Sequence, residues 1–259
     1  MRIRQLGSTI GVQDARQYLT SYLVDDCVAI DAGSLGFLSP LSLQQSIQHV
    51  FLSHSHLDHV ASLPTFLDNV HQGGSDCPMV YGSQDVLDCL SRDLFNERLW
   101  PDLDQLAQAG ICFYKPAEIQ SEVPVTLGPL TITPVAVDHV VPTLGFLIED
   151  AQSAIVIASD SGPTDRIWEL ASRATFRQKL KIVFLECSFP NDMEELAQKS
   201  KHLYSQQFAS EVAKISAGPP FQTVAVHLKP IFEAQIHREL MALNLPNLQI
   251  GGQDATWEL

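Results

Sequence analysis

The sequence contains no run of about 18 apolar residues, which is the length that a helix needs to cross a lipid bilayer. It also begins without the apolar core and small-residue cleavage site of a secretory leader. The residues Met1-Arg2-Ile3-Arg4 lead instead into a short strand-like stretch. These absences predict a cytoplasmic protein of 259 residues with no membrane partner.

Cysteine is scarce, and its spacing is uninformative. The five cysteines are odd in number and include no C-x-x-C pair. Such a pattern favours neither a disulfide framework nor a cage of thiolates around zinc. We expect reduced cysteines, with Cys27 and Cys187 packed as small apolar side chains within strand-like runs.

Basic residues are few. The chain has 16 lysines and arginines against 30 aspartates and glutamates, for a formal net charge of −14. Such a surface repels polyanions, whereas proteins that bind long nucleic acids usually carry a basic stripe. A long nucleic acid is therefore not expected as a partner. A small phosphate ester is compatible with the charge because bound metal ions would supply positive charge locally.

The pattern of apolar runs predicts a layered α/β protein. Two stretches repeat a rhythm of paired strands followed by alternating strands and helices, and they meet near residues 124–129. We therefore expect one domain over residues 1–259, made of two αβ halves, about 1–125 and 126–259. Predicted elements include helices over 58–69 and 83–100 and a strand over 110–115. Active sites of such sheets tend to lie at strand ends.

The densest chemical feature is His54-Ser55-His56-Leu57-Asp58-His59, with three imidazoles and one carboxylate directly after an apolar strand. Where the chain is extended, His54 and His56 point the same way because side chains alternate. Asp58 and His59, at the turn into a helix, can face a second point. The segment therefore predicts two metal positions. The alternative is a polar loop in which Asp58 caps the helix and the histidines are solvated.

A metal pair needs more ligands than these four. His139, Asp160 and His227 each follow a predicted strand. Each alone is equally compatible with a turn residue or a hydrogen-bonded edge histidine. Together with the first segment they complete two ligand sets, and the two oxygens of Asp160 allow it to bridge.

This order, H-x-H-x-D-H followed by an isolated histidine, aspartate and histidine at strand ends, resembles the metallo-β-lactamase superfamily over most of the chain. The resemblance implies a four-layer αββα sandwich. It implies His54, His56 and His139 on one metal ion, Asp58, His59 and His227 on the other, and Asp160 between them. It also implies that Asp31 orients the metal-binding segment from behind the ligands. An ordinary turn before Gly33 would explain Asp31 equally well.

Finer features are similar to one group of this superfamily, the class II cyclic-nucleotide phosphodiesterases. They are His54-Ser55-His56-Leu57-Asp58-His59-Val60, Ala158-Ser159-Asp160-Ser161-Gly162-Pro163 and Val226-His227-Leu228-Lys229-Pro230. Gly11-Val12-Gln13-Asp14 and Asp31-Ala32-Gly33-Ser34 fit the same group. After Ser62-Leu63 the class II pattern continues with aliphatic residues, and Pro64-Thr65 departs from it.

The resemblance implies a binuclear metal phosphodiesterase. It would hydrolyse 3',5'-cyclic nucleotides, cAMP or cGMP or both, to 5'-nucleotides by attack of a metal-bridging hydroxide on phosphorus. Asp58, Asp160 and His202 are the expected catalytic residues. Glu186 and His202 lie in a pair of loops shared with tRNA 3'-processing nucleases, in which the corresponding histidine lies near the leaving group. We expect Glu186 behind the ligands, and His202 would alternatively cap a helix that begins near Tyr204.

Several alternatives remain at this point. A tRNA 3'-processing endonuclease shares nearly all of the metal residues, but neither its exosite arm nor its positive surface is evident in the sequence. Another small phosphodiester hydrolase, or a non-catalytic scaffold of the same fold, is a further alternative. The ligand set accepts zinc, manganese or iron, and zinc is favoured. The resemblance also implies a homodimer, and no substrate-binding residue is identified.

Overall fold

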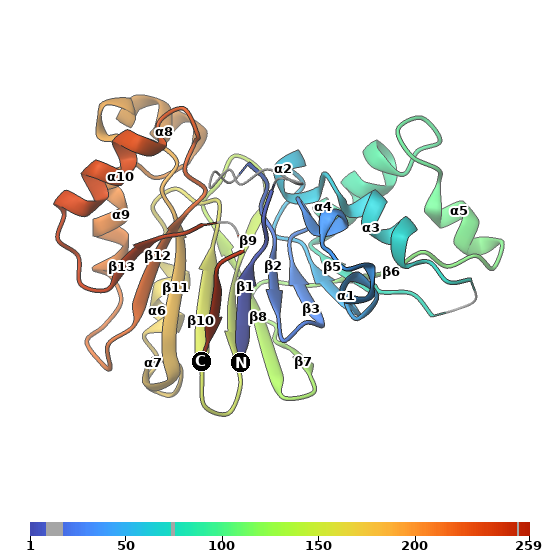
Figure 1. The fold of residues 1–259 in the computed structure, drawn as a ribbon, viewed down its shortest axis with the longest axis horizontal. Coiled ribbons are helices and arrows are strands. Elements are labelled where there is room, and N and C mark those ends of the chain that lie inside the picture. Colours follow the sequence, from blue (N-terminus) through green and yellow to red (C-terminus); the bar gives the residue numbers. More distant parts are fainter. Residues whose placement is uncertain (9–17, 74–75, 253) are drawn as a thin grey trace. The chain divides into compact units, whose positions relative to one another are not determined.

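The protein is described by a computed structural model that covers residues 1–8, 18–73, 76–252 and 254–259 (Figure 1). It divides into two compact units. The N-terminal unit comprises Arg2–Ile119 and Gln253–Glu258, and the C-terminal unit comprises Gln120–Gly252 with Met1 and Leu259. No helix of the described ranges is long and apolar enough to cross a membrane. The division into halves near residue 125 stays a prediction.

The N-terminal unit is built on a seven-stranded sheet. In sheet order its strands are β14 (Thr256–Glu258), β1 (Arg2–Gln5), β2 (Tyr22–Val24), β3 (Val28–Ile30), β4 (His49–Phe51), β5 (Met79–Gly82) and β6 (Lys115–Glu118). The pairs from β14 to β3 are antiparallel and those from β3 to β6 are parallel. The carboxyl ends of β3, β4 and β5 therefore meet at one edge.

Helices cover one face of this sheet. They are the 3-10 turn η1 (Leu35–Phe37), α1 (Leu41–Gln45), α2 (Leu57–Val60), α3 (Leu63–Val70), α4 (Gln84–Cys89), the π-helical turn η2 (Leu90–Leu94) and α5 (Leu103–Gln108). Their apolar side chains, among them Leu63, Phe66 and Val86, form a core with strand residues such as Val50 and Val80. This packing fixes the segments that follow the strands.

Three sequence predictions in this unit need correction. The expected helix 58–69 is two helices, α2 and α3, and Pro64 lies buried in the first turn of α3, where proline is tolerated. The expected helix 83–100 ends at Leu94, because Phe95 leaves the helix and pairs with Trp100. The strand expected over 110–115 begins only at Lys115.

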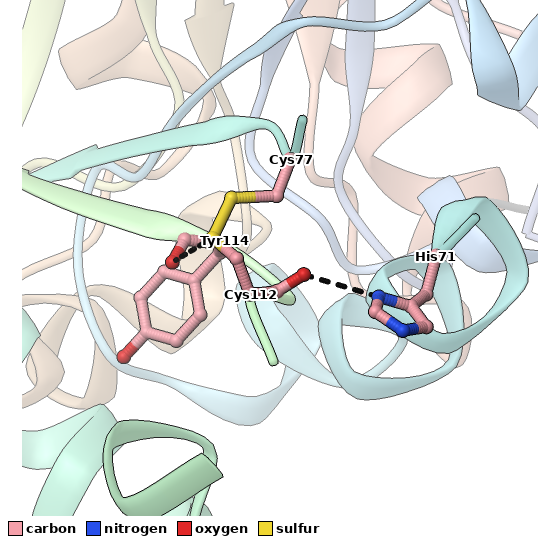
Figure 2. Close-up of a disulfide and its surroundings, with 4 residues drawn as sticks. All are labelled: His71, Cys77, Cys112 and Tyr114. Carbon is pink, nitrogen blue, oxygen red and sulfur yellow. Dashed lines mark hydrogen bonds between the residues drawn. A yellow bond between two sulfur atoms is a disulfide. The ribbon is translucent and has the colours of Figure 1, made fainter. Parts of the chain in front are cut away.

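The crossover from β5 to β6 is closed by a disulfide between Cys77 and Cys112, 35 residues apart in sequence (Figure 2). All five cysteines were expected to be reduced, and this expectation is wrong for the pair. Spacing along the chain gave no indication of it because adjacent parallel strands bring the two cysteines together, with Met79 beside Lys115 in the register. His71 also contacts the bridge through its Nδ1, 3.0 Å from the carbonyl oxygen of Cys112.

The other three cysteines are free. Cys187 is fully buried, as expected, and burial raises the pKa of its thiol. Cys27 is only partly buried, so the prediction of a packed side chain is incorrect there.

The C-terminal unit carries a second seven-stranded sheet. In sheet order its strands are β13 (Leu248–Ile250), β12 (Gln222–Val226), β11 (Leu180–Glu186), β10 (Ala154–Ala158), β9 (Thr143–Glu149), β8 (Leu130–Val137) and β7 (Val125–Leu127). The pairs from β7 to β10 are antiparallel and those from β10 to β13 are parallel. This order of pairings repeats that of the first sheet, although no sequence repeat accompanies it.

The helices of this unit are α6 (Arg166–Ala171), α7 (Ala174–Lys179), the 3-10 turn η3 (Asn191–Met193), α8 (Glu194–Ser200), α9 (Ser205–Val212) and α10 (Glu233–Ala242). Trp168, Phe208 and Ile236 pack from α6, α9 and α10 into a core with the strands. β10 is buried at every position, which matches its apolar sequence Ala-Ile-Val-Ile-Ala. Pro163 lies outside α6, which begins at Arg166.

Candidate metal centre

The segment after β4 brings its histidines together. The ring centroids of His54 and His56 are 4.6 Å apart, and those of His54 and His59 are 4.2 Å apart. His56 has an extended backbone directly before α2, and Asp58 and His59 lie in α2. His54 and His59 are fully buried. A solvated capping loop would expose these rings, so the structure does not support that alternative.

Asp31 holds this segment from the adjacent strand end. Its carboxylate accepts a hydrogen bond from the backbone N–H of Ser53 at 2.8 Å and from the Ser53 hydroxyl at 2.9 Å. The Nδ1 of His59 lies 2.7 Å from the second carboxylate oxygen. The Ser53 hydroxyl also lies 3.0 Å from the Nδ1 of His54. The Nε2 atoms of both histidines are thus presented on the side away from Asp31.

Backbone strain marks the same place. Asp31 has a φ of 60°, in the left-handed region that few residues adopt without cause. A Cβ built on Gly33 would lie 2.0 Å from the carbonyl oxygen of Asp58, so only glycine allows this close approach. The backbone N–H of Ala32 donates to the carbonyl of His59 at 2.7 Å. The turn after β3 and helix α2 are therefore docked backbone to backbone.

Within the N-terminal unit the four predicted ligands form two pairs. His54 and His56 each offer a ligand atom within 4.8 Å of the other, and so do Asp58 and His59. The closest approach between Asp58 and the Nε2 of His59 is 3.9 Å. Two atoms that bind one ion at about 2.1 Å and a tetrahedral angle lie about 3.4 Å apart. The distance between the ligand atoms of each pair is therefore close to that of two ligands of a single metal ion.

The three isolated residues meet within the C-terminal unit. The Nε2 of His139 lies 3.9 Å from one carboxylate oxygen of Asp160, and the Nε2 of His227 lies 3.5 Å from the other. His139 donates from its Nδ1 to the carbonyl of Lys201 at 3.0 Å. Burial lowers the pKa of His139, which favours the neutral imidazole that a metal requires.

Glu186 is the most heavily hydrogen-bonded carboxylate of this unit among the described residues, and it is fully buried. One oxygen accepts from the N–H of Ser161 at 2.9 Å and from the Nδ1 of His202 at 2.6 Å. The other accepts from the Ser188 hydroxyl at 2.7 Å and from the N–H groups of Ser188 and Leu203, both at 3.2 Å. Glu186 thus joins the Asp160 loop to the loop that carries His202.

His202 does not cap α9, because the residue that precedes this helix is Tyr204 and no side chain caps it. It pairs instead with Glu186. Burial alone lowers the pKa of His202, but the charge and hydrogen bond of the Glu186 carboxylate outweigh burial and raise it. Glu186, His202 and His227 offer three possible ligand atoms within 4.8 Å of one another. Since five donors already occupy the oxygens of Glu186, we interpret this group as a hydrogen-bonded cluster and not as a third metal position.

Sequence reasoning missed the groups that orient the ligands, namely the hydroxyls of Ser53 and Ser188 and the backbone carbonyl of Lys201. Ser53, Ser188 and Lys201 all contact a predicted metal ligand. Their only mark in the sequence is adjacency, since each lies within two residues of His54, Glu186 or His202. The Gly11-Val12-Gln13-Asp14 motif lies outside the described residues.

Comparison with solved structures gives the fold. The metallo-β-lactamase fold protein YhfI from Bacillus subtilis matches with a TM-score of 0.73 and 20% identity over 99% of each chain. Unliganded yeast PDE1 matches with a TM-score of 0.78 and 18% identity over 96% of each chain. Human tRNase Z, short form, has a TM-score of 0.69 and 16% identity over 100% of this chain and 99% of that one. The chain therefore has the metallo-β-lactamase fold, and the predicted fold is confirmed.

The family follows from the sequence comparison. The model of the class-II cAMP phosphodiesterases matches residues 37–214. A probable 3',5'-cyclic-nucleotide phosphodiesterase from Yersinia pestis is 27% identical over 95% of this chain and 82% of its own length. The 3',5'-cyclic-nucleotide phosphodiesterase 1 of Saccharomyces cerevisiae is 24% identical over 62% of this chain and 47% of its own length.

The chain belongs to the class-II cAMP phosphodiesterase family. It is a hydrolase that acts on 3',5'-cyclic nucleotides and carries His/Asp clusters suited to metal ions, as predicted. Pro64, which departs from the class II pattern, lies within the matched residues and does not alter this assignment.

Proposed function

We propose that the His/Asp sets of the two units together hold two divalent metal ions. His54, His56 and His139 would bind one, Asp58, His59 and His227 the other, and Asp160 would bridge them. The observation that carries the proposal is Asp160, whose two oxygens approach two different histidines, His139 and His227. Ligand chemistry supports it, because four of the imidazoles hydrogen-bond through Nδ1 and present Nε2.

Zinc is the metal that we favour, since imidazole and carboxylate ligands suit it. A fold relative, PqqB from Methylobacterium extorquens, was crystallised with zinc and has a TM-score of 0.72 at 14% identity. When bound, the ions would polarise the phosphoryl oxygens and lower the pKa of water. The chain's own residues position those ions and the substrate's reacting atoms.

The reaction that this arrangement serves is hydrolysis of the 3' ester of a cyclic nucleotide. A water oxygen forms a bond to phosphorus, the bond from phosphorus to the 3' oxygen breaks, and that oxygen takes up a proton. We assign the proton to His202, because its pairing with Glu186 raises the pKa of the ring and favours the protonated form. The attacking water loses one proton to solvent, and solvent returns one to His202 after the 3' oxygen has left. Asp58 and Asp160 would act by holding the ions, and Asp31 and Glu186 by orienting the residues that bind substrate or metal.

The test is a substrate panel with metal analysis. Purified protein is assayed with cAMP, cGMP, a chromogenic phosphodiester and a precursor tRNA, before and after a chelator, and its metal content is measured. We expect about two ions per chain, turnover of a cyclic nucleotide, and loss of turnover with the ions. Turnover of the tRNA alone would overturn the substrate assignment, and a folded protein that binds no metal would overturn the site.

Two finer expectations stand beside this proposal. A homodimer is expected from the family resemblance, and sedimentation velocity would test it. No long nucleic acid is expected as a partner, given the net charge of −14.

A cytoplasmic location was expected, but the Cys77–Cys112 disulfide counts against it because such bonds persist in oxidising compartments. Alkylation of the free thiols in intact cells, followed by mass spectrometry, would show whether Cys77 and Cys112 are bonded there. A bonded pair would contradict a cytoplasmic location, and a reduced pair would agree with it.

A further inference from the structure

In the C-terminal unit, the hydroxyl of Ser188 lies close to three ionisable side chains, those of Glu186, His202 and His227. Ser188 follows β11 by two residues and is fully buried. Its hydroxyl oxygen lies 2.7 Å from a carboxylate oxygen of Glu186 and 2.9 Å from the Nδ1 of His227. The carbonyl of His227 is 3.1 Å away, and the Nδ1 of His202 is 3.4 Å away. No predicted role attaches to this serine.

The direction of these hydrogen bonds follows from counting protons. A hydroxyl has one proton to donate and can accept from others. The buried carboxylate at 2.7 Å is the strongest acceptor within reach, so the proton goes to Glu186. The hydroxyl oxygen then accepts from the Nδ1–H of His227. A neutral His227 with its proton on Nδ1 presents a lone pair on Nε2, the atom that lies 3.5 Å from Asp160.

The backbone of His227 adopts an uncommon conformation, and its side chain needs a separate restraint. His227 has a φ of 59°, in the left-handed region that histidine seldom adopts. Main-chain bonds join the neighbouring strands on their own, with the N–H of Cys187 donating to Val226 at 2.9 Å. These main-chain hydrogen bonds position the backbone at His227, but they do not restrain the side-chain torsions of its imidazole. The Ser188 hydroxyl fixes the ring.

We infer that Ser188 is a positioning residue that sets the tautomer and orientation of His227 for metal binding and couples this ligand to the Glu186–His202 pair. The inference rests on the proposed function, because it gives His227 a metal to bind. It predicts that loss of the hydroxyl weakens the metal site while leaving the fold and the Glu186–His202 bond in place. Glu186 keeps its four other hydrogen bonds without it.

The experiment compares Ser188→Ala with Ser205→Ala. Ser205 is equally buried and belongs to the same unit, but its hydroxyl lies 3.9 Å from the sulfur of Cys187 and touches no predicted ligand. Zinc affinity is measured by competition with a chromophoric chelator, and circular dichroism checks the fold. Ser188→Ala should lose about 10- to 100-fold in affinity for one of the two ions, and Ser205→Ala should keep the wild-type value.

Two further readouts separate positioning from a merely structural role. Turnover of cAMP by Ser188→Ala should recover as free zinc is raised, with KM unchanged. In the zinc-loaded wild-type protein, the ring nitrogen resonances of His227 should show the proton on Nδ1. A proton on Nε2, or equal zinc affinity in Ser188→Ala and wild type, would overturn the inference. A wild-type protein that binds no zinc would instead overturn the proposed function, so the two failures are distinguishable.

Discussion

The two units each contain a buried carboxylate that orients histidines, but they build it differently. Asp31 receives hydrogen bonds from a single segment, Ser53 to His59, which the parallel pairing of β3 and β4 brings alongside. Glu186 receives hydrogen bonds from three segments, at Ser161, Ser188 and 202–203. The same order of strand pairings therefore supports a carboxylate that is held by one partner segment in the N-terminal unit and one that is held by three in the C-terminal unit.

The kinds of donor also differ. Backbone N–H groups bond to both oxygens of Glu186, whereas only one oxygen of Asp31 receives a backbone N–H. The partners of the second Asp31 oxygen, the Ser53 hydroxyl and the His59 ring, can reverse their role as donor or acceptor. A backbone N–H cannot reverse. We therefore expect the Asp31 arrangement to tolerate change better than the Glu186 arrangement.

The largest expected effect concerns a feature that only the N-terminal unit has among the described residues, its disulfide. Cys77→Ser with Cys112→Ser should lower the free energy of unfolding by about 4 kcal/mol, the entropy of closing a loop of this length. Hydrogen exchange should quicken around β5 and β6 and stay unchanged in the C-terminal unit. Faster exchange in both units alike would show that the units do not respond separately.

Exchanging each carboxylate for its amide tests the comparison directly. In Glu186→Gln, either orientation of the amide sets its NH₂ group against a backbone N–H, so the free energy of unfolding should fall by about 3 kcal/mol. In Asp31→Asn, the oxygen can face the N–H of Ser53 while the NH₂ group donates to Ser53 Oγ, for a loss of about 1 kcal/mol. Urea unfolding of the metal-free proteins measures both. Equal losses would contradict the distinction drawn above.

Loss of the histidine that Glu186 holds should act on catalysis. His202→Ala should retain both metal ions and the fold but reduce kcat for cAMP by about a hundredfold, because the departing 3' oxygen loses its proton donor. His237→Ala is the matched control, since His237 is exposed in the same unit. A His202→Ala enzyme with near wild-type turnover would remove His202 from the mechanism.

The smallest expected effect is a dependence on pH. In the metal-free protein the pKa of His202 is raised above its ordinary value of 6.5. The protonated pair with Glu186 therefore contributes stability that is fully present below that ordinary value and is lost as the pH rises through the raised pKa. In Glu186→Gln the burial of the ring remains while the carboxylate is gone, so the pKa should fall. Histidine ring NMR over a pH series would show the shift, and an unmoved titration would exclude Glu186 as its cause.

The contrast between the two carboxylates also explains what the sequence could predict. His54 to His59 form a continuous motif after an apolar strand, and Asp31 precedes it in a recognisable turn, so both could be proposed from the sequence. His139, Asp160 and His227 could be proposed only because they complete that motif. Ser188 and Lys201 were missed because their contacts depend on tertiary structure, as does the Cys77–Cys112 pair. The helix over 83–100 was overextended because apolar spacing carries no information about the turn at Phe95.

The position of the disulfide has a practical consequence. Cys77 and Cys112 precede β5 and β6, whereas the segment from His54 follows the end of the parallel strand β4. The disulfide therefore lies at the amino-terminal ends of these parallel strands, and the predicted metal-binding segment lies at their carboxyl-terminal ends. A reagent that joins the two reduced sulfurs through a linker could carry a fluorophore or bind the protein to a solid support. The attachment would be at the strand ends opposite the predicted metal site. The sensor or immobilised catalyst made in this way should keep its access to substrate.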